Sequence, residues 1–88
     1  MIEQRMRIRS SGLSWRELDG KIMLLDIRSS AYLSISGAGS VIWTALAKGA
    51  TVDELVDVVT SEFDVTQQTA LNHVTEFVDE LNAKGLLA

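Results

Sequence analysis

A change in hydrophobic period near residue 36 constrains the fold of this chain more than any other feature of its sequence. Before this point, apolar residues alternate over short segments; after it, they recur about every 3.6 residues. Alternation is typical of half-buried strands, and the longer period is typical of amphipathic helices. Because both patterns fit within 88 residues, we expect one domain in which a small sheet precedes several helices.

The first part of the chain predicts a three-stranded antiparallel sheet. Its expected strands span residues 13–18, 22–27 and 31–35. Asp19-Gly20 lies between the first two strands, and this dipeptide is the strongest short signal for a two-residue hairpin. Leu13 and Trp15 are expected on one face of the first strand. The third strand ends the meander, so we expect one of its edges to be free.

Both faces of the middle strand are apolar. One face carries Met23, Leu25 and Ile27, and the other carries Ile22 and Leu24. The sequence leaves open whether the N-terminal arm or another subunit covers the second of these faces. The third strand alternates more clearly, with Ala31, Leu33 and Ile35 on one face and Tyr32 and Ser34 on the other.

The second part predicts three helices. The first is expected at about residues 38–47, with Gly49 beyond its end. Thr51 and Glu54 have the spacing of a capping box, which predicts a second helix from residue 52. Thr66 is the expected cap of the longest helix, at about residues 67–84. An apolar stripe of about 120° follows this helix through Ala70, Leu71, Val74, Phe77, Val78 and Leu81.

Together these elements predict a winged-helix-like α+β fold, a three-stranded antiparallel sheet followed by three helices. Residues 1–12 are expected to form an N-terminal arm, and residues 13–88 the domain. The basic side chains of the arm, Arg5, Arg7 and Arg9, are expected to be solvated. The connections between the predicted elements are only a few residues long, which leaves no room for a second domain.

The composition argues against catalysis. The chain has no cysteine and a single histidine, His73, so a cysteine nucleophile or a multi-histidine zinc site is excluded within one chain. Ser40 lacks the flanking glycines of a nucleophile elbow. Gly37-Ala38-Gly39 lacks the third glycine of a dinucleotide-binding loop. We therefore expect no enzymatic activity and no cofactor.

Charge is distributed unevenly along the chain, and it disfavours nucleic acid as a partner. Residues 1–28 contain six Lys/Arg and four acids, whereas residues 29–88 contain two lysines and eight acids. A DNA-recognition helix needs Lys or Arg to neutralise phosphates, and residues 66–83 contain neither. No apolar run approaches the roughly 20 residues of a membrane-spanning helix, and no signal peptide is recognisable. We expect a cytoplasmic protein with no nucleic-acid or membrane partner.

The remaining features favour a peptide as the partner. The free edge of residues 31–35 could form one wall of a groove, and the broad apolar stripe of the last helix could form the other. An extended peptide binds such a groove by strand addition, in which the backbone edge fixes the register and side-chain pockets select the sequence. The breadth of the stripe could equally belong to the core.

Three segments resemble the PqqD-like RiPP recognition elements, which bind precursors of ribosomally made and post-translationally modified peptides. Residues 23–36, MLLDIRSSAYLSIS, are similar to the family signature LLD-x-R-x-G-x-Y-x-x-L-N. Residues 39–51, GSVIWTALAKGAT, match the pattern G-x-x-V/I-W-x-x-L-x-x-G-x-T. Residues 77–87, FVDELNAKGLL, match the ending F-x-x-x-L-x-x-x-G-L-L. Ser30 and Ser36 stand where Gly and Asn are common, a mild departure because serine also suits turns and caps.

Within this family, the chain most resembles the discrete leader-binding proteins of lasso peptide gene clusters. The resemblance implies that the leader peptide of a precursor binds as an added antiparallel strand, beside the third strand and against the last helix. It also implies presentation of the leader to a leader peptidase and an ATP-dependent macrolactam cyclase. Lasso leaders typically carry Tyr-x-x-Pro, whose Tyr and Pro are the implied anchors. The alternatives are a PqqD-type peptide chaperone of pyrroloquinoline quinone biosynthesis and a winged-helix regulatory or interaction domain.

The expected peptide-binding residues come from both walls of the groove. The third strand contributes Ala31, Tyr32, Leu33, Ser34 and Ile35. The last helix contributes Gln67, Leu71, Val74, Thr75 and Val78. Leu33 and Val74 could instead be core residues. Three acids of the same helix could attract lysines of a basic leader, namely Glu76, Asp79 and Glu80.

Overall fold

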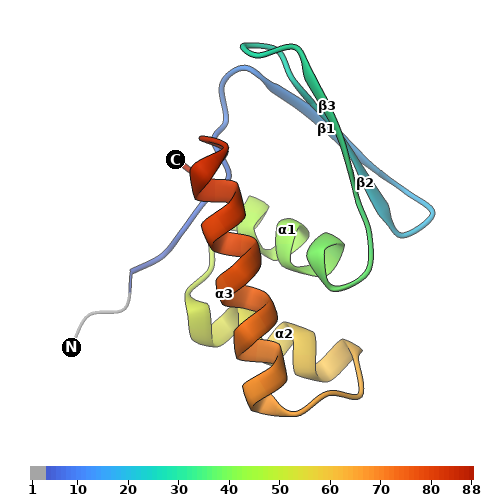
Figure 1. Cartoon of the computed structure of the whole chain (residues 1–88), viewed down its shortest axis with the longest axis vertical. Coiled ribbons are helices and arrows are strands. Elements are labelled where there is room, and N and C mark those ends of the chain that lie inside the picture. Colours follow the sequence, from blue (N-terminus) through green and yellow to red (C-terminus); the bar gives the residue numbers. More distant parts are fainter. Residues whose placement is uncertain (1–3) are drawn as a thin grey trace.

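A computed structural model describes residues 4–88 and has the predicted α+β architecture (Figure 1). Three strands come first, β1 (Leu13–Leu18), β2 (Lys21–Asp26) and β3 (Ala31–Ile35). Three helices follow, α1 (Ala38–Lys48), α2 (Val52–Glu62) and α3 (Gln67–Ala83). In Figure 1 the sheet lies to one side of the helices, and the chain ends shortly after the long helix α3. The predicted boundaries agree with these to within one residue, and a shift of one residue is the usual uncertainty of element ends.

The sheet is an antiparallel meander with the strand order β1-β2-β3. Leu18 pairs with Lys21 across the first turn, where Asp19 and Gly20 both have positive φ. A two-residue hairpin turn of this kind needs φ > 0 at both positions, which Asp-Gly tolerates well. The hairpin that the sequence predicts is therefore confirmed, and it fixes the register of the first two strands.

The middle strand turns its Ile22 and Leu24 face toward the helices. Both side chains are fully buried, and both belong to a core cluster that includes Ile42, Trp43 and Leu46 of α1. The Ile22 and Leu24 face, whose covering element the sequence left open, is therefore covered by a helix of the same chain. Apolar residues occupy both alternations of β2, so only the packing of α1 could identify the core face.

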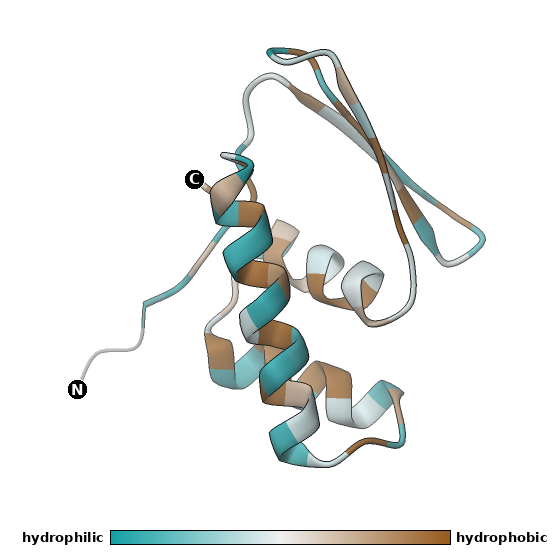
Figure 2. Cartoon of the chain, viewed as in Figure 1, coloured by the Kyte–Doolittle hydropathy of each residue, from teal (hydrophilic) through white to brown (hydrophobic). Residues whose placement is uncertain are grey.

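The helices begin and end where the local sequence dictates. The Thr51 hydroxyl accepts from the Glu54 backbone N–H at 3.2 Å, and the Glu54 carboxylate accepts from the Thr51 N–H at 2.9 Å, so the predicted capping box is present. Thr66 accepts from the Thr69 N–H at 3.1 Å and caps α3. Hydrophobic and hydrophilic residues alternate along α3 (Figure 2). Its apolar side supplies three buried residues to the core, Ala70, Val74 and Leu81.

Two tryptophans join the sheet to the helices. Trp15 of β1 and Trp43 of α1 are in T-shaped contact, with ring centroids 5.8 Å apart. Trp43 is fully buried, whereas Trp15 keeps 38% of its surface exposed. An edge-to-face arrangement is a preferred geometry for aromatic pairs. The face of β1 that carries Leu13 and Trp15 is thus directed toward the helices.

The backbone of the N-terminal arm packs on the domain, while the side chains of Arg5 and Arg7 are exposed as predicted. Met6 forms an antiparallel bridge with Ala50, and Ile8 forms one with Leu87. The Ala88 N–H donates to the Arg7 carbonyl at 2.8 Å. The arm therefore joins the α1–α2 connection to the C-terminal residues. The first three residues of the expected arm lie outside the described residues.

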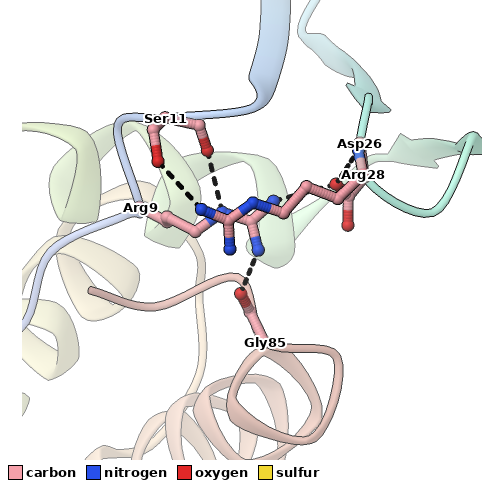
Figure 3. A network of polar contacts seen from close by, with 5 residues as sticks. All are labelled: Arg9, Ser11, Asp26, Arg28 and Gly85. Atoms are coloured by element: carbon pink, nitrogen blue, oxygen red, sulfur yellow. Dashed lines mark hydrogen bonds and ion pairs between the residues drawn. The ribbon is translucent and has the colours of Figure 1, made fainter.

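Arg9 anchors the arm through a network of polar contacts (Figure 3). Its guanidinium donates to the Asp26 carboxylate at 2.8 Å, the Gly85 carbonyl at 2.6 Å and the Ser11 carbonyl at 2.9 Å. The Arg28 N–H also donates to Asp26, at 3.1 Å. Burial raises the pKa of Asp26, but these hydrogen bonds and the Arg9 charge outweigh it and leave the pKa below its ordinary value. Arg9 is thus a half-buried ion-pair partner that links the arm, β2 and the end of α3. The expectation of a solvated Arg9 is therefore wrong.

None of the helices between residues 4 and 88 combines the length and apolar character that crossing a membrane requires.

Candidate functional site: a groove between β3 and α3

β3 has one unpaired edge. It pairs only with β2 within the described sheet, because the strand order places it at the end. In an antiparallel strand, alternate residues direct their backbone N–H and C=O groups away from the neighbouring strand. β3 therefore presents a row of backbone donors and acceptors that another extended chain could pair with.

A groove of about 320 Å³ runs along this edge. It lies between β3, the start of α1 and one side of α3, and its lining residues are Leu33, Ser34, Ile35, Ser36, Gly39, Phe77, Glu80, Leu81 and Lys84. The floor is apolar, since Leu81 is buried and Phe77 is half-buried against the core. The rim is polar, and Glu80 and Lys84 lie 3.9 Å apart as an exposed ion pair. An apolar floor beside an open strand edge is the arrangement used in strand addition.

Gly39 shapes the wall where α1 meets the groove. A Cβ atom at this position would lie 2.9 Å from Ile35 Cγ2 and 3.0 Å from Phe77 Cε1. Contacts this short would force both side chains to move. The absence of a side chain at Gly39 therefore lets the first turn of α1 approach β3 and α3 together.

The groove continues along α3 past Phe77. A second hollow of about 280 Å³ shares Gly39, Phe77 and Glu80 with it and adds Ala38, Ile42, His73 and Glu76. Glu76 and Glu80, two of the three acids expected to attract a basic leader, thus line this side of the helix. Asp79, the third, does not line either hollow.

The structure places the predicted β3 residues in two groups. Leu33, Ser34 and Ile35 line the groove. Ala31 is half-buried beside Asp26, its partner on β2. Tyr32 is on the opposite, outer face of the sheet and is 63% exposed. The free edge of β3 therefore extends past the groove toward Ala31, because all five residues belong to one strand.

The predicted α3 residues do not form the wall that faces β3. Val74 is fully buried in the core. Gln67 and Leu71 line a separate hollow beside α2, together with Asp53, Val56 and Gln68. Thr75 is exposed and Val78 half-buried, and neither lines the groove within the described chain. Gln67, Leu71, Thr75 and Val78 lie at one margin of the apolar stripe. The groove is lined by the opposite margin, where Phe77 lies.

Phe77, Leu81 and Lys84 line the groove but were not predicted to bind the peptide, and neither were Ser36 and Gly39. Glu80 was predicted only as an acid that could attract lysines of a basic leader. A signal for the helical residues was present, because Phe77 and Leu81 belong to the predicted stripe and Lys84 follows at helical spacing. A stripe defines which residues are apolar but not which of its two margins faces the sheet. The position of α1 settles this, since Gly39 contacts the Phe77 margin.

The described residues offer no cluster for metal chemistry. Between residues 4 and 88, no three His, Cys, Asp or Glu side chains gather closely enough to hold a metal ion. His73 is exposed on α3 and lies beside Glu76 and Glu80 at the second hollow.

Comparison with known proteins identifies a family and two similar solved structures. Residues 21–87 match the family described as Coenzyme PQQ synthesis protein D (PqqD). TbiB1 in complex with the TbiA(beta) leader peptide has a TM-score of 0.84 and 29% sequence identity, covering 93% of this chain and 94% of that chain. A lasso peptide synthetase B1 complexed with the leader peptide has a TM-score of 0.81 and 25% identity, covering 94% and 96%. No curated protein sequence matches the chain.

Proposed function

Because the chain belongs to the PqqD family, and because its fold is shared with two leader-peptide complexes, we propose that it binds the leader peptide of a ribosomally made precursor in lasso peptide biosynthesis. The observation that carries this proposal is the open β3 edge beside an apolar groove. Ribosomes make such a precursor in the cytoplasm, so we place binding of the leader there.

In this proposal the leader adds to the sheet as a fourth strand. Its backbone pairs with the free groups of Ala31 to Ile35, and each hydrogen bond contributes about 0.5–1.5 kcal/mol net. Alternate side chains of the added strand then enter the groove, while the others point to the outer face of the sheet. The edge therefore fixes the register, and the groove selects the side chains.

The groove chemistry supports an apolar anchor with a cationic neighbour. Leu33, Ile35, Phe77 and Leu81 provide apolar contact, which suits the Tyr and Pro of a Tyr-x-x-Pro leader. Glu80 at the rim could pair with a lysine or arginine of the leader. Such rim charges change the association rate and its salt dependence more than the final affinity.

We further propose that the chain holds the leader while separate proteins act on it. These partners are a leader peptidase and an ATP-dependent macrolactam cyclase. In this scheme the chain contributes binding and orientation and performs no catalytic step, so chemistry at the leader and core peptide is left to its partners.

Single N-methyl groups along the leader test the strand-addition model. The probe is a synthetic lasso leader peptide with the Tyr-x-x-Pro motif, prepared with one N-methylated residue at a time and titrated by calorimetry. Methylation removes a backbone donor, so affinity should fall by about tenfold at every second residue facing β3. Peptides that are methylated at the intervening residues should bind nearly as tightly as the unmethylated peptide. A loss without this period of two would contradict strand addition.

The family description favours a second candidate, a peptide chaperone of pyrroloquinoline quinone biosynthesis. The same groove would then hold a different precursor for a radical enzyme. Competition between the two precursor peptides for the wild-type chain separates the candidates. Tighter binding of the quinone precursor, by about tenfold or more, would replace the lasso assignment while leaving strand addition intact.

A further inference from the structure

The outer face of the sheet is an exposed apolar surface that, apart from Ser34 at its edge, does not line the leader groove. We define this outer face by the residues that alternate with the buried ones, namely Ser14, Arg16, Leu18, Lys21, Met23, Leu25, Tyr32 and Ser34. Leu18 is 58% exposed, Leu25 39% and Tyr32 63%. Scattered single hydrophobics are common on protein surfaces, but a contiguous group of large ones marks an interaction site.

The outer face is also hollowed. A depression of about 320 Å³ is lined by Ser14, Trp15, Arg16, Leu18, Met23, Leu25 and Tyr32. Ser14, Leu25 and Tyr32 form one row across the three strands, and Arg16, Met23 and Ser34 form the next. The depression therefore crosses the strands and offers a partner side chain contact on several sides, as buried anchors at protein interfaces require.

The charges on this face have a single sign. Arg16 and Lys21 are its only ionisable groups besides the Tyr32 phenol, and both are exposed. Within the described chain, neither has an acidic partner within 4 Å. The helical part of the chain is acidic by contrast, with eight acids and two lysines over residues 29–88. A surface with unpaired cations around apolar side chains is complementary to one with carboxylates around apolar side chains.

We propose that the outer face of the sheet docks a protein partner that presents aliphatic or aromatic side chains beside Asp or Glu. A second copy is a poor occupant, because a two-fold contact would bring Arg16 and Lys21 of both copies together. Two cations are also too few for nucleic acid, whose binding needs several phosphate contacts.

The proposal rests on the proposed function for the identity of the partner. A leader strand added to β3 extends the same face beyond Tyr32 and Ser34, so alternate leader side chains lie flush with it. A protein docked on this face would thus reach the leader from the side that the groove leaves open. The partner is accordingly one of the two enzymes proposed to act on the leader.

The test titrates four variants against three probes by calorimetry. The probes are a purified lasso leader peptidase, a purified macrolactam cyclase and the same synthetic Tyr-x-x-Pro leader peptide. Leu18→Ser and Arg16→Glu alter the outer face. Val52→Ser is the matched apolar control, because Val52 is 39% exposed at the start of α2, and Lys48→Glu is the matched charge control on α1. Circular dichroism confirms that each variant is folded.

We expect Leu18→Ser and Arg16→Glu to weaken binding of one enzyme by more than about tenfold. The two controls should change it by less than about twofold, and all four should bind the leader like the wild type. Unchanged affinity of both enzymes for the outer-face variants would overturn the proposal. Equal losses in the control variants would also overturn it.

The leader titration keeps the two proposals separate. If the wild-type chain fails to bind the leader, the proposed function fails, and the enzyme titrations still report on the outer face. Sedimentation at high protein concentration and flotation with anionic vesicles examine the other occupants. Self-association or vesicle binding that Leu18→Ser abolishes would assign the face to a second copy or to lipid and overturn the proposal.

Discussion

Arg9 shows how one side chain can hold distant parts of a small chain together. Its guanidinium contacts Asp26 at the end of β2, the carbonyl of Gly85 after α3 and the carbonyl of Ser11. The sequence placed Arg9 on a solvated arm, because a basic residue in a short polar segment carries no sign of a buried partner. A long-range ion pair of this kind depends on the tertiary fold and not on local pattern.

Arg9→Ala should destabilise the protein more than Arg5→Ala. Removing Arg9 leaves the buried Asp26 carboxylate without its main partner, whereas Arg5 pairs with the exposed Glu54 at 3.3 Å. An unpaired buried charge costs far more than a lost surface pair. Urea denaturation should show a clearly lower midpoint for Arg9→Ala and a nearly unchanged one for Arg5→Ala. Equal midpoints for the two variants would contradict the role of Arg9 as partner of the buried Asp26.

Gly39→Ala should weaken leader binding without unfolding the protein. Alanine favours helix over glycine by about 1 kcal/mol, which offsets part of the strain from contact with Ile35 and Phe77. Both displaced side chains line the groove, so we expect a loss of leader affinity of about tenfold. Ala47→Gly, an exposed change near the end of α1, is the control for altered helix propensity. Wild-type affinity in folded Gly39→Ala would contradict this account of the groove.

At the scale of elements, the sequence predicted each strand and helix, because the local signals agree with the fold. Asp19-Gly20, Thr51 and Thr66 mark a turn and two helix starts with side chains that act on neighbouring backbone. The orientation of the elements was harder to predict. β2 has two apolar faces and α3 has a broad stripe, so neither pattern defines the direction of packing.

Phe77→Leu and Leu71→Ala distinguish the two margins of α3. Phe77 lines the groove beside β3, whereas Leu71 lines a hollow beside α2. We expect Phe77→Leu to lower leader affinity by several-fold to about tenfold, because an aromatic contact is lost from the groove floor. Leu71→Ala should bind the leader like the wild type. Fluorescence anisotropy of a labelled leader measures both, and the reverse result would restore the margin that the sequence favoured.

At the scale of the whole molecule, the arm, the sheet and the C-terminal residues meet at the ion pair of Arg9 and Asp26. The carboxyl group of Asp26 makes this junction sensitive to pH. The pKa of Asp26 in the folded protein lies below the ordinary value of about 3.9, although burial alone would raise it. A group of this kind adds stability above its ordinary pKa, and that stability is lost as the pH falls through the lower, folded value. The pKa of Glu54 is also lowered, chiefly by the hydrogen bond from the Thr51 N–H, so it acts in the same direction.

Titration of Asp26 and Glu54 should therefore leave the free energy of unfolding nearly constant above about pH 5 and lower it steadily below about pH 4. Asp26→Asn removes the contribution of Asp26 and leaves that of Glu54. The free energy of unfolding should then fall less steeply with decreasing pH than in the wild type. Urea denaturation at a series of pH values measures this slope. An Asp26→Asn curve that falls as steeply as the wild type would contradict the assignment to Asp26.

The contact between Trp15 and Trp43 gives the molecule an optical signature of its assembly. Two indole rings 5.8 Å apart at an angle of 83° are close enough for their electronic transitions to couple, which produces an exciton couplet in the circular dichroism spectrum. One ring belongs to β1 and the other to α1, so the couplet reports whether the sheet is seated on the helices. Separation of the two layers can thus be followed without any label, even while strands and helices persist.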